Sequence, residues 1–160
     1  MAAGNPPFSY SPPDGGLFFL DTNIFVYALL SSEPLKKQRA LDLIELALNS
    51  RRGCVSYQVL QEFANVATRK FAQRLSALEC QQFVDAALQP LNRVGSSPEL
   101  LAAALVLQEE SRYSFYDSLM LAAALQAGAT TVYTEDLQHH QLLRGSLRIV
   151  NPFLDTVHAN

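Results

Sequence analysis

Short apolar runs alternate with longer helical patterns along this chain, and the alternation restricts the folds it can adopt. The run LFFL at 17–20 and the β-branched run at 130–134 are typical of buried strands, and 53–56 indicates another. Apolar residues recur at helical spacing over about 34–49, 57–71, 76–89, 98–112 and 116–126. Strands that alternate with helices favour a parallel sheet covered on both faces, so we predict an α/β fold.

Two weaker strand candidates, at 91–94 and 147–150, extend the expected sheet to four to five strands. Ser97-Pro98 opens one of the expected helices, with proline at its preferred first position. A short helix is also expected to start near Asp136. The predicted architecture is a three-layer α/β/α arrangement around a short central parallel sheet.

The first 16 residues differ in composition from the rest. They contain four prolines and three glycines, which is typical of a flexible leader. They have neither a basic start nor an apolar stretch, so we do not expect a signal peptide. A chain of 160 residues fits one domain of ordinary size, about 100–150 residues. We therefore predict a leader at 1–16 and a single domain at 17–155.

Composition excludes several classes of protein. The longest apolar runs, such as 100–107, are far too short to cross a bilayer, which needs about 20 residues. A formal charge of −3 argues against nonspecific coating of nucleic acid, although it does not exclude a nuclease. The two cysteines, Cys54 and Cys80, do not suggest a disulfide framework. We expect a cytoplasmic protein that does not associate with a membrane.

Four acidic residues lie near strand ends or helix starts in this pattern. Asp21 closes the first strand, and Asp136 comes just past the strand at 130–134. Glu62 is in the second turn of the helix after the second strand, and Asp117 is in the first turn of the most apolar helix. In a parallel α/β sheet, these positions all lie at the carboxyl edge, where ligands bind. We therefore predict that the four carboxylates converge.

Most of these acids also have an ordinary structural interpretation. Asp21, Thr22 or Asn23 could simply cap the helix that follows the first strand. Asp117 and Asp136 could instead be explained by the favourable interaction of an acid with a helix N-terminus. For each of these three acids taken alone, the ordinary and functional interpretations are about equally good.

Glu62 is harder to explain in this way. At helical spacing it shares a face with Val59, Phe63 and Val66, so a charge is set into an apolar stripe. A carboxylate buried in such a stripe should be neutral, paired or bound to a metal. Ordinary surface exposure remains an alternative if the helix has one edge in solvent.

Taken together, the four acids indicate a metal site. Like charges that crowd together destabilise a fold unless a cation intervenes, and none of the four acidic motifs contains a lysine or arginine. Mg²⁺ or Mn²⁺ prefers oxygen ligands and is often held by only a few carboxylates. Such an ion can ionise a water molecule and neutralise charge on a phosphodiester. Hydrolysis of a phosphate ester is the chemistry that suits this arrangement best.

Four motifs carry a resemblance to a known family: LDTN (20–23), Gln61-Glu62-Phe63, SFYDSLMLAAA (114–124) and VYTEDL (132–137). Their order and spacing resemble those of the PIN-domain nucleases. The closest resemblance is to the VapC-like toxin ribonucleases of bacterial toxin–antitoxin modules. It extends from about residue 17 to Phe153, which is nearly the whole chain outside the leader.

The resemblance implies a catalytic and metal-binding site formed by Asp21, Glu62, Asp117 and Asp136. Asn23 and Thr134 match the polar residues beside the acids, which orient carboxylates or water. A helix cap and a strand residue are the ordinary interpretations of these two residues. Glu135 could contribute to a second ion site, although simple exposure is its more ordinary state.

Two features depart from this family. The leader is longer than in toxins of this group, and His139-His140 follow the last acid. Solvation is the ordinary interpretation of this histidine pair, and contact with RNA phosphate is the alternative. Basic residues beyond Glu62 could also contact RNA phosphates, although a solvated helix end explains them equally well. These residues are Arg69, Lys70 and Arg74.

We therefore predict a Mg²⁺- or Mn²⁺-dependent endoribonuclease, the toxin of a toxin–antitoxin pair. The resemblance implies an RNA substrate, an antitoxin protein partner and a homodimer, for which the helices at 34–49 and 57–71 could supply apolar residues. One alternative is a non-catalytic, degenerate RNA-binding module. Another is an aspartate-dependent phosphatase, but Asn23 occupies the position where that class carries a second aspartate.

Overall fold

The computed structural model describes residues 15–154. Residues 1–14 and 155–160, and with them most of the expected leader and the expected end of the domain, lie outside the described residues. Gly15 and Gly16 precede the first strand. Among residues 15–154, none of the helices is long and apolar enough to span a bilayer.

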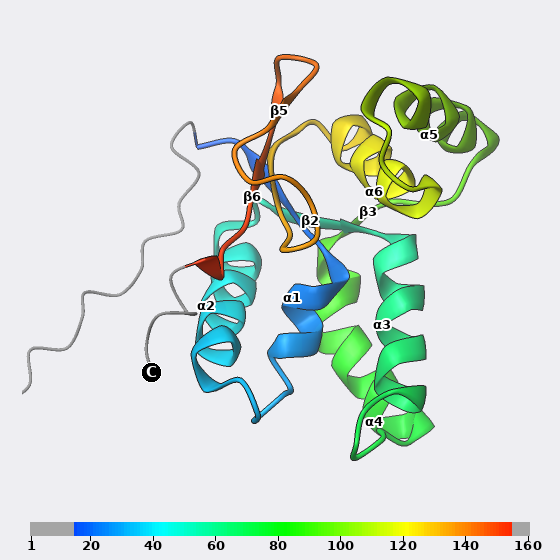
Figure 1. The fold of residues 1–160 in the computed structure, drawn as a ribbon. Coiled ribbons are helices and arrows are strands. Elements are labelled where there is room, and N and C mark those ends of the chain that lie inside the picture. Colours follow the sequence, from blue (N-terminus) through cyan, green and yellow to red (C-terminus); the bar gives the residue numbers. More distant parts are fainter. Residues whose placement is uncertain (1–14, 155–160) are drawn as a thin grey trace, which may run out of the picture.

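A six-stranded sheet with the order β3-β2-β1-β4-β6-β5 forms the centre of the described residues (Figure 1). The strands are β1 (Leu17–Leu20), β2 (Gly53–Ser56), β3 (Asn92–Val94), β4 (Ala129–Tyr133), β5 (Leu142–Leu143) and β6 (Leu147–Val150). All neighbouring pairs are parallel except β5 and β6, which are antiparallel. The expected parallel strands are present, and the additional β5 has only two residues, too few to produce a sequence pattern.

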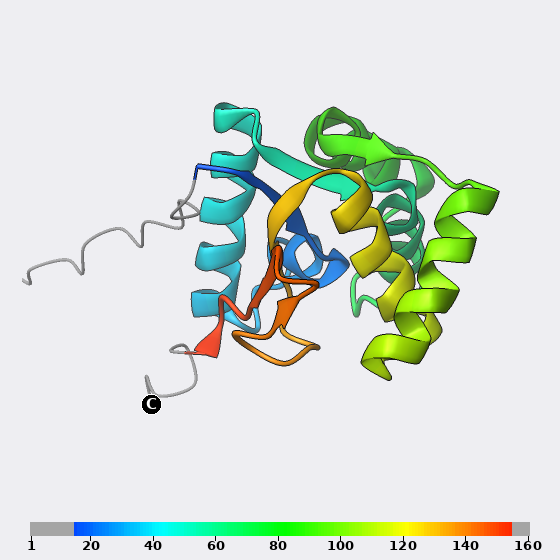
Figure 2. The ribbon, with the colours of Figure 1, turned by 90° about the horizontal axis from the view of Figure 1, so that it is seen from above.

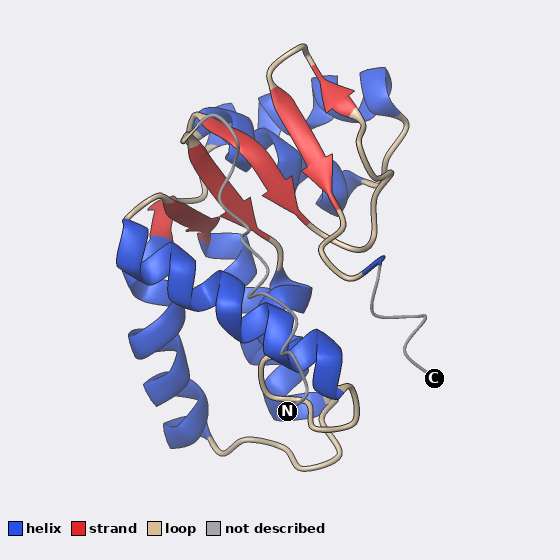
Figure 3. Cartoon of the chain, turned by 90° about the vertical axis from the view of Figure 1, so that its left-hand side faces the viewer, coloured by secondary structure: helices blue, strands red, loops and turns tan. Residues whose placement is uncertain are grey.

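Helices cover both faces of this sheet. They are α1 (Thr22–Tyr27), α2 (Pro34–Ser50), α3 (Tyr57–Arg69), α4 (Ala77–Phe83), α5 (Pro98–Ser111) and α6 (Phe115–Gln126). The helices α1 to α4 lie on one side, and the paired helices α5 and α6 lie on the other (Figures 1 and 3). The predicted three-layer α/β/α architecture is confirmed.

Two helical segments differ from expectation. The helix expected over 76–89 ends its α-helical part at Phe83 and continues as a π-helical turn (Val84–Leu88) and a 3-10 turn (Gln89–Leu91). Pro90 lies in this last turn and has no backbone N–H to continue an α-helix. The short helix expected near Asp136 is wrong, because the chain after β4 forms bends and a turn before β5.

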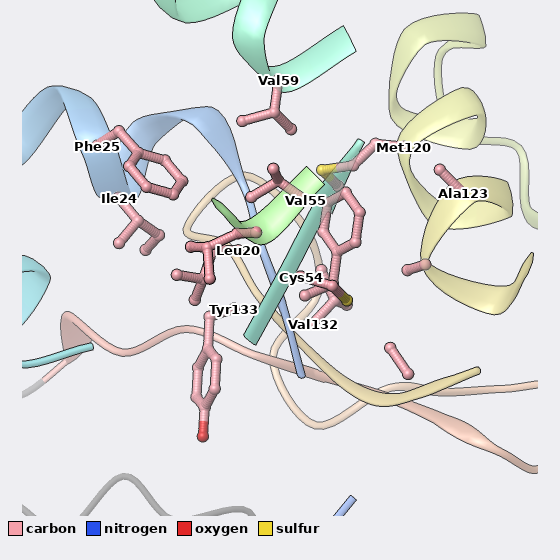
Figure 4. Close-up of a cluster of buried hydrophobic side chains, with 14 of the residues drawn as sticks. Leu20, Ile24, Phe25, Cys54, Val55, Val59, Met120, Ala123, Val132 and Tyr133 are labelled. Carbon is pink, nitrogen blue, oxygen red and sulfur yellow. The ribbon is translucent and has the colours of Figure 1, made fainter. Parts of the chain in front are cut away.

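The core lies between the sheet and both helical layers. In β1, Phe18, Phe19 and Leu20 are completely buried, as expected for a central parallel strand covered on both faces. Figure 4 shows Ile24 and Phe25 of α1, Val59 of α3, and Met120 and Ala123 of α6 around the central strands. These contacts fix the helix starts relative to the strand ends.

Close packing of α2 on β2 requires a glycine. A Cβ atom added to Gly53 would lie 2.2 Å from the Cβ of Ala47. The side chain of any other residue would therefore push α2 away from the sheet.

The strand order places a topological switch point beside β1. The chain runs from β1 to β2 and β3 on one side, and β4 then pairs with the other edge of β1. Figure 2 shows β1 between β2 and β4. Ligands of open parallel sheets bind outside the carboxyl ends of the strands at such a point. Asp21 directly follows β1 there.

Candidate active site

The structure brings the four predicted acids together in one cleft of about 350 Å³ at the switch point. Asp21 comes from the end of β1, Glu62 from α3, Asp117 from the first turn of α6, and Asp136 from the loop after β4. The other lining residues are Thr22, Asn23, Val26, Tyr27, Leu30 and Val66. Four carboxylates from four distant segments therefore face the same space.

Asp21 is the most buried of the four acids, with 7% of its surface exposed. It is the N-cap of α1, and its Oδ1 accepts a hydrogen bond of 2.6 Å from the backbone N–H of Thr22. Its Oδ2 accepts a 2.7 Å hydrogen bond from the hydroxyl of Thr134. The capping interpretation of Asp21 is thus confirmed, and the same carboxylate lines the cleft.

Burial raises the pKa of Asp21 from 3.8 to about 7. The hydrogen bonds from Thr134 and Thr22 oppose this rise, while the charges of Asp136 and Glu62 add to it. A carboxylate with this pKa is poorly stabilised by the protein alone. A bound cation would supply the missing stabilisation.

Asp136 is hydrogen-bonded to the same Thr134 hydroxyl as Asp21. Its backbone N–H donates a 3.2 Å hydrogen bond to the hydroxyl of Thr134, and its Oδ2 accepts a 3.2 Å hydrogen bond from Asn23. Partial loss of hydration raises the pKa of Asp136, and the negative charges of Glu135 and Asp117 raise it further. Asn23 and Thr134 therefore contact the acids directly, and their proposed role in orienting them stays a prediction.

Glu62 is half-buried and held at both carboxylate oxygens. The hydroxyl of Thr22 donates a 2.7 Å hydrogen bond to its Oε2, and the side-chain amide of Gln58 donates one of 2.7 Å to its Oε1. Of the apolar residues at helical spacing from Glu62, Val59 and Phe63 are buried, and Val66 is half-buried and lines the cleft with Glu62. The carboxylate is therefore directed into the cleft by neutral donors.

Asp117 is positioned by the capping residue of its own helix. Ser114 is the N-cap of α6, and its hydroxyl oxygen lies 3.2 Å from the backbone nitrogen of Asp117, which donates to it. The same hydroxyl is 2.8 Å from Oδ2 of Asp117. Asp117 therefore interacts favourably with the N-terminus of α6 and also lines the cleft.

The donor atoms of the cleft fit a hard divalent cation. They are carboxylate oxygens together with Oδ1 of Asn23, which is buried and has no hydrogen-bond partner. Within residues 15–154, no three carboxylate, thiol or imidazole groups converge closely enough to form a complete metal cluster. Mg²⁺ and Mn²⁺ do not require one, because one or two carboxylates with water and substrate phosphate can hold Mg²⁺. The residues present therefore fit such an ion.

Comparison with known families identifies the fold. The model of the PIN domain family matches residues 18–143, which include all four acids. The chain belongs to the PIN domain family.

Three solved structures share the fold of this PIN domain. A toxin–antitoxin complex from Klebsiella pneumoniae contains a chain 20% identical, with a TM-score of 0.57, and the match covers 84% of this chain and 96% of that one. FitAB bound to the IR36 DNA fragment matches at 19% identity and a TM-score of 0.58, with coverages of 86% and 96%. VapBC2 from Rickettsia felis bound to a promoter DNA fragment matches at 20% identity and a TM-score of 0.56, and the match covers 84% of this chain and 99% of that one. The search of curated proteins found no match.

Glu135 of this PIN domain belongs to a separate cluster and is not free for a second ion. Its carboxylate forms a 3.0 Å ion pair with Lys36 and accepts a hydrogen bond from the hydroxyl of Tyr27. Lys36 also lies 4.6 Å from the centre of the Tyr27 ring. Partial burial alone would lower the pKa of Lys36, but its hydrogen bonds to Tyr27 and Glu135 raise it. This cluster fixes the residue next to Asp136.

The predicted basic residues and the histidines lie outside the cleft lining. Arg69, Lys70 and Arg74 are exposed at and beyond the end of α3. Arg69 is seven residues from Glu62, so it lies on the same face of α3, about 10 Å along the helix. Nδ1 of His139 accepts a hydrogen bond of 2.9 Å from the backbone N–H of Asn151, and the ring of the exposed His140 lies against that of His139 at an interplanar angle of 43°. His139 therefore has a structural role in the turn before β5.

Three residues that hold the acids were not predicted from the sequence. Ser114 could have been recognised, because a serine three residues before an acid is a helix-start pattern. Thr22 appeared only as a possible cap, and Gln58 did not appear at all. Their contacts with Glu62 depend on the packing of α1 against α3, which leaves no local sequence signal.

Proposed function

We propose that this PIN domain is a Mg²⁺- or Mn²⁺-dependent endoribonuclease and the toxin of a toxin–antitoxin pair. The observation that supports the proposal is the convergence of four carboxylates, from four separate segments, on one open cleft at the switch point. An arrangement of like charges with a raised pKa at Asp21 is costly to fold and is explained by a cation-dependent site.

The residues of the cleft would have different roles in this reaction. Asp21 and Asp117 would hold the ion, directly or through water, with Glu62 and Asp136 on either side. When bound, the ion would activate a water molecule and neutralise charge on the phosphodiester. The hydrogen bonds from Thr22 and Gln58 direct Glu62 into the cleft, and the Thr134 hydroxyl holds Asp21 and Asp136 in position relative to each other.

The acidic cleft also requires help to attract RNA. Four carboxylates repel a phosphate backbone until a cation neutralises them. Arg69, Lys70 and Arg74 provide positive charge beyond the cleft on the side of α3. We propose that they contact phosphates away from the cleavage point and orient the strand without reading its sequence.

An antitoxin partner and a homodimer are part of the same proposal. The structural neighbours include a toxin–antitoxin complex from Klebsiella pneumoniae and VapBC2 from Rickettsia felis. Large apolar side chains are exposed on α2 and α3, at Leu35, Leu41 and Tyr57, where the sequence suggested a dimer face.

The proposal is tested by incubating single-stranded RNA with the purified full-length protein in Mg²⁺, in Mn²⁺ and in EDTA. The Asp21→Asn variant, purified identically, controls for a contaminating nuclease. Cleavage that requires both the metal ion and Asp21 supports the proposal. RNA that the wild type binds but leaves intact under all three conditions would favour the non-catalytic RNA-binding alternative.

A further inference from the structure

A second, smaller pocket lies beside the active-site cleft at the carboxyl edge of the sheet. Its volume is about 220 Å³, and it lies among the ends of β2 and β3, the starts of α3 and α5, and α6. Its apolar lining residues are Val94, Leu100, Leu101, Phe115 and Leu119. Its polar side chains are Ser56, Gln58, Ser96 and Ser97. The pocket is therefore a mainly apolar cavity with a few polar groups, which is the usual composition of a small-ligand site.

Two buried polar atoms of this lining have no partner. Ser56 is 1% exposed, and its hydroxyl makes no hydrogen bond, not even as a cap for α3. Oε1 of Gln58 is also buried without a partner. Buried polar groups are normally hydrogen-bonded, because an unpaired one costs about 1–3 kcal/mol. Both atoms are closed to water in the free protein, so a ligand that supplies a donor and an acceptor would reach them when the side chains of Ser56 and Gln58 rotate toward the cavity.

Gln58 joins this pocket to the active-site cleft. Its Nε2 donates to Oε1 of Glu62 at 2.7 Å and to the backbone carbonyl of Tyr116, next to Asp117, at 3.2 Å. One side of the Gln58 amide therefore holds a carboxylate of the cleft, while the residue also lines the pocket. A molecule in the pocket would be separated from the cleft by one side chain.

We propose that this pocket binds one nucleobase of the RNA strand, adjacent to the phosphodiester held in the cleft. The inference rests on the proposed function. The volume is below the roughly 300–1,000 Å³ of typical small-molecule pockets, so it suits one base better than a whole nucleotide. Phe115 offers an aromatic ring for a base, Oε1 of Gln58 accepts from a base N–H, and the hydroxyl of Ser56 can donate or accept. Single-stranded RNA is recognised through such unstacked bases.

Occlusion of the pocket gives the first test. Leu101→Trp places a bulky ring at a half-exposed lining position, and Leu105→Trp places the same ring one helical turn further along α5, outside the lining. Cleavage is measured on single-stranded RNAs that differ in one base beside the cleavage point. We expect a preference of about tenfold for one base in the wild type and in Leu105→Trp, and its loss in Leu101→Trp. A preference that persists unchanged in Leu101→Trp overturns the inference.

Removal of a single hydroxyl gives the second test. Ser56→Ala deletes an unpartnered hydroxyl, so the variant should be at least as stable as the wild type. Ser118→Ala is its control, because Ser118 is equally buried and unpartnered but does not line the pocket. We expect Ser56→Ala to lower the base preference and Ser118→Ala to leave it intact. Equal effects of the two substitutions would contradict a role in base recognition.

A binding measurement separates this inference from the proposed function. Adenosine, cytidine, guanosine and uridine carry no phosphate, so their binding requires no metal ion. We expect one of them, at millimolar concentration, to shift the amide NMR signals of Ser96, Ser97 and Leu100 in the full-length wild type but not in Leu101→Trp. Such shifts without RNA cleavage would uphold the pocket and refute the nuclease. Metal-dependent cleavage without shifts from any of the four nucleosides would refute the pocket alone.

Discussion

The hydroxyl of Thr134 donates a 2.7 Å hydrogen bond to Oδ2 of Asp21, although the two residues are 113 positions apart in the chain. The same hydroxyl accepts the backbone N–H of Asp136. One small side chain therefore joins the ends of β1 and β4, the two strands that border the switch point. Any loosening of this contact affects two of the four acids at once.

We predict that Thr134→Val lowers RNA cleavage by about 10- to 100-fold, because it removes the donor to Asp21 and leaves the N–H of Asp136 unpaired. Thr134→Ser retains the hydroxyl and should restore most of the activity. The measurement is kcat/KM for both variants against the wild type. Wild-type activity in Thr134→Val, or a loss in Thr134→Ser as large as the loss in Thr134→Val, would contradict the role of the hydroxyl.

The stability of the metal-free protein should depend on Asp21. Its pKa is raised from 3.8 to about 7, so the folded state retains a proton that the unfolded state releases. The proton on Asp21 stabilises the folded state fully below about pH 3.8, and this stabilisation is lost as the pH rises to about 7. Asp21→Asn should therefore stabilise the protein in EDTA by up to about 4 kcal/mol at alkaline pH.

Urea unfolding of wild type and Asp21→Asn in EDTA at about pH 5 and pH 8 measures this effect. The free energy of unfolding of Asp21→Asn should exceed that of the wild type by an amount that increases with pH. An advantage that is constant or decreases between the two pH values would contradict the raised pKa of Asp21.

The ion pair of Lys36 and Glu135 should anchor the loop that carries Asp136. Only 19% and 22% of the two side chains are exposed, so Lys36→Gln leaves a poorly hydrated carboxylate without its cation. We predict a loss of about 1–3 kcal/mol in the free energy of unfolding, together with reduced cleavage. Lys37→Gln removes the neighbouring charge and should change stability by less than about 0.5 kcal/mol. Indistinguishable unfolding curves for the two variants would refute the anchor.

The basic residues at and beyond the end of α3 should affect the binding of RNA and not the rate of the chemical step. Neutralising Arg69, Lys70 and Arg74 to glutamine is predicted to raise KM, leave kcat nearly unchanged and weaken the salt dependence of RNA binding. Arg51→Gln is a suitable control, because Arg51 precedes β2 at the opposite edge of the sheet. A lower kcat with an unchanged KM would place these residues in the chemistry instead.

The strand ends explain why so much of the site could be predicted from the sequence. Asp21 and Asp136 follow apolar runs that are typical of buried strands, and parallel strands bring their carboxyl ends together. Glu62 and Asp117 are placed by their positions near the starts of α3 and α6, which the apolar stripes of these helices indicate. Local patterns combined with one topological rule were therefore sufficient to place all four acids.

The contacts that hold the acids could not be predicted in this way. Glu135 was expected to be exposed, but Lys36, 99 residues earlier in the chain, pairs with it. The hydroxyl of Thr22 reaches Glu62 only because α1 packs against α3. These pairings depend on tertiary packing, and neither partner carries a sequence pattern that identifies the other.

The most direct test of the account is the single-turnover rate of RNA cleavage in Mn²⁺ for the wild type, Asp117→Asn and Asp42→Asn. Asp117 lines the cleft, whereas Asp42 is a half-buried acid on α2 that lies outside the cleft lining and is hydrogen-bonded to Gln38. We predict that Asp117→Asn lowers the rate by about 100-fold or more and that Asp42→Asn leaves it unchanged. Equal rates in Asp117→Asn and the wild type would contradict a catalytic site built from the four carboxylates.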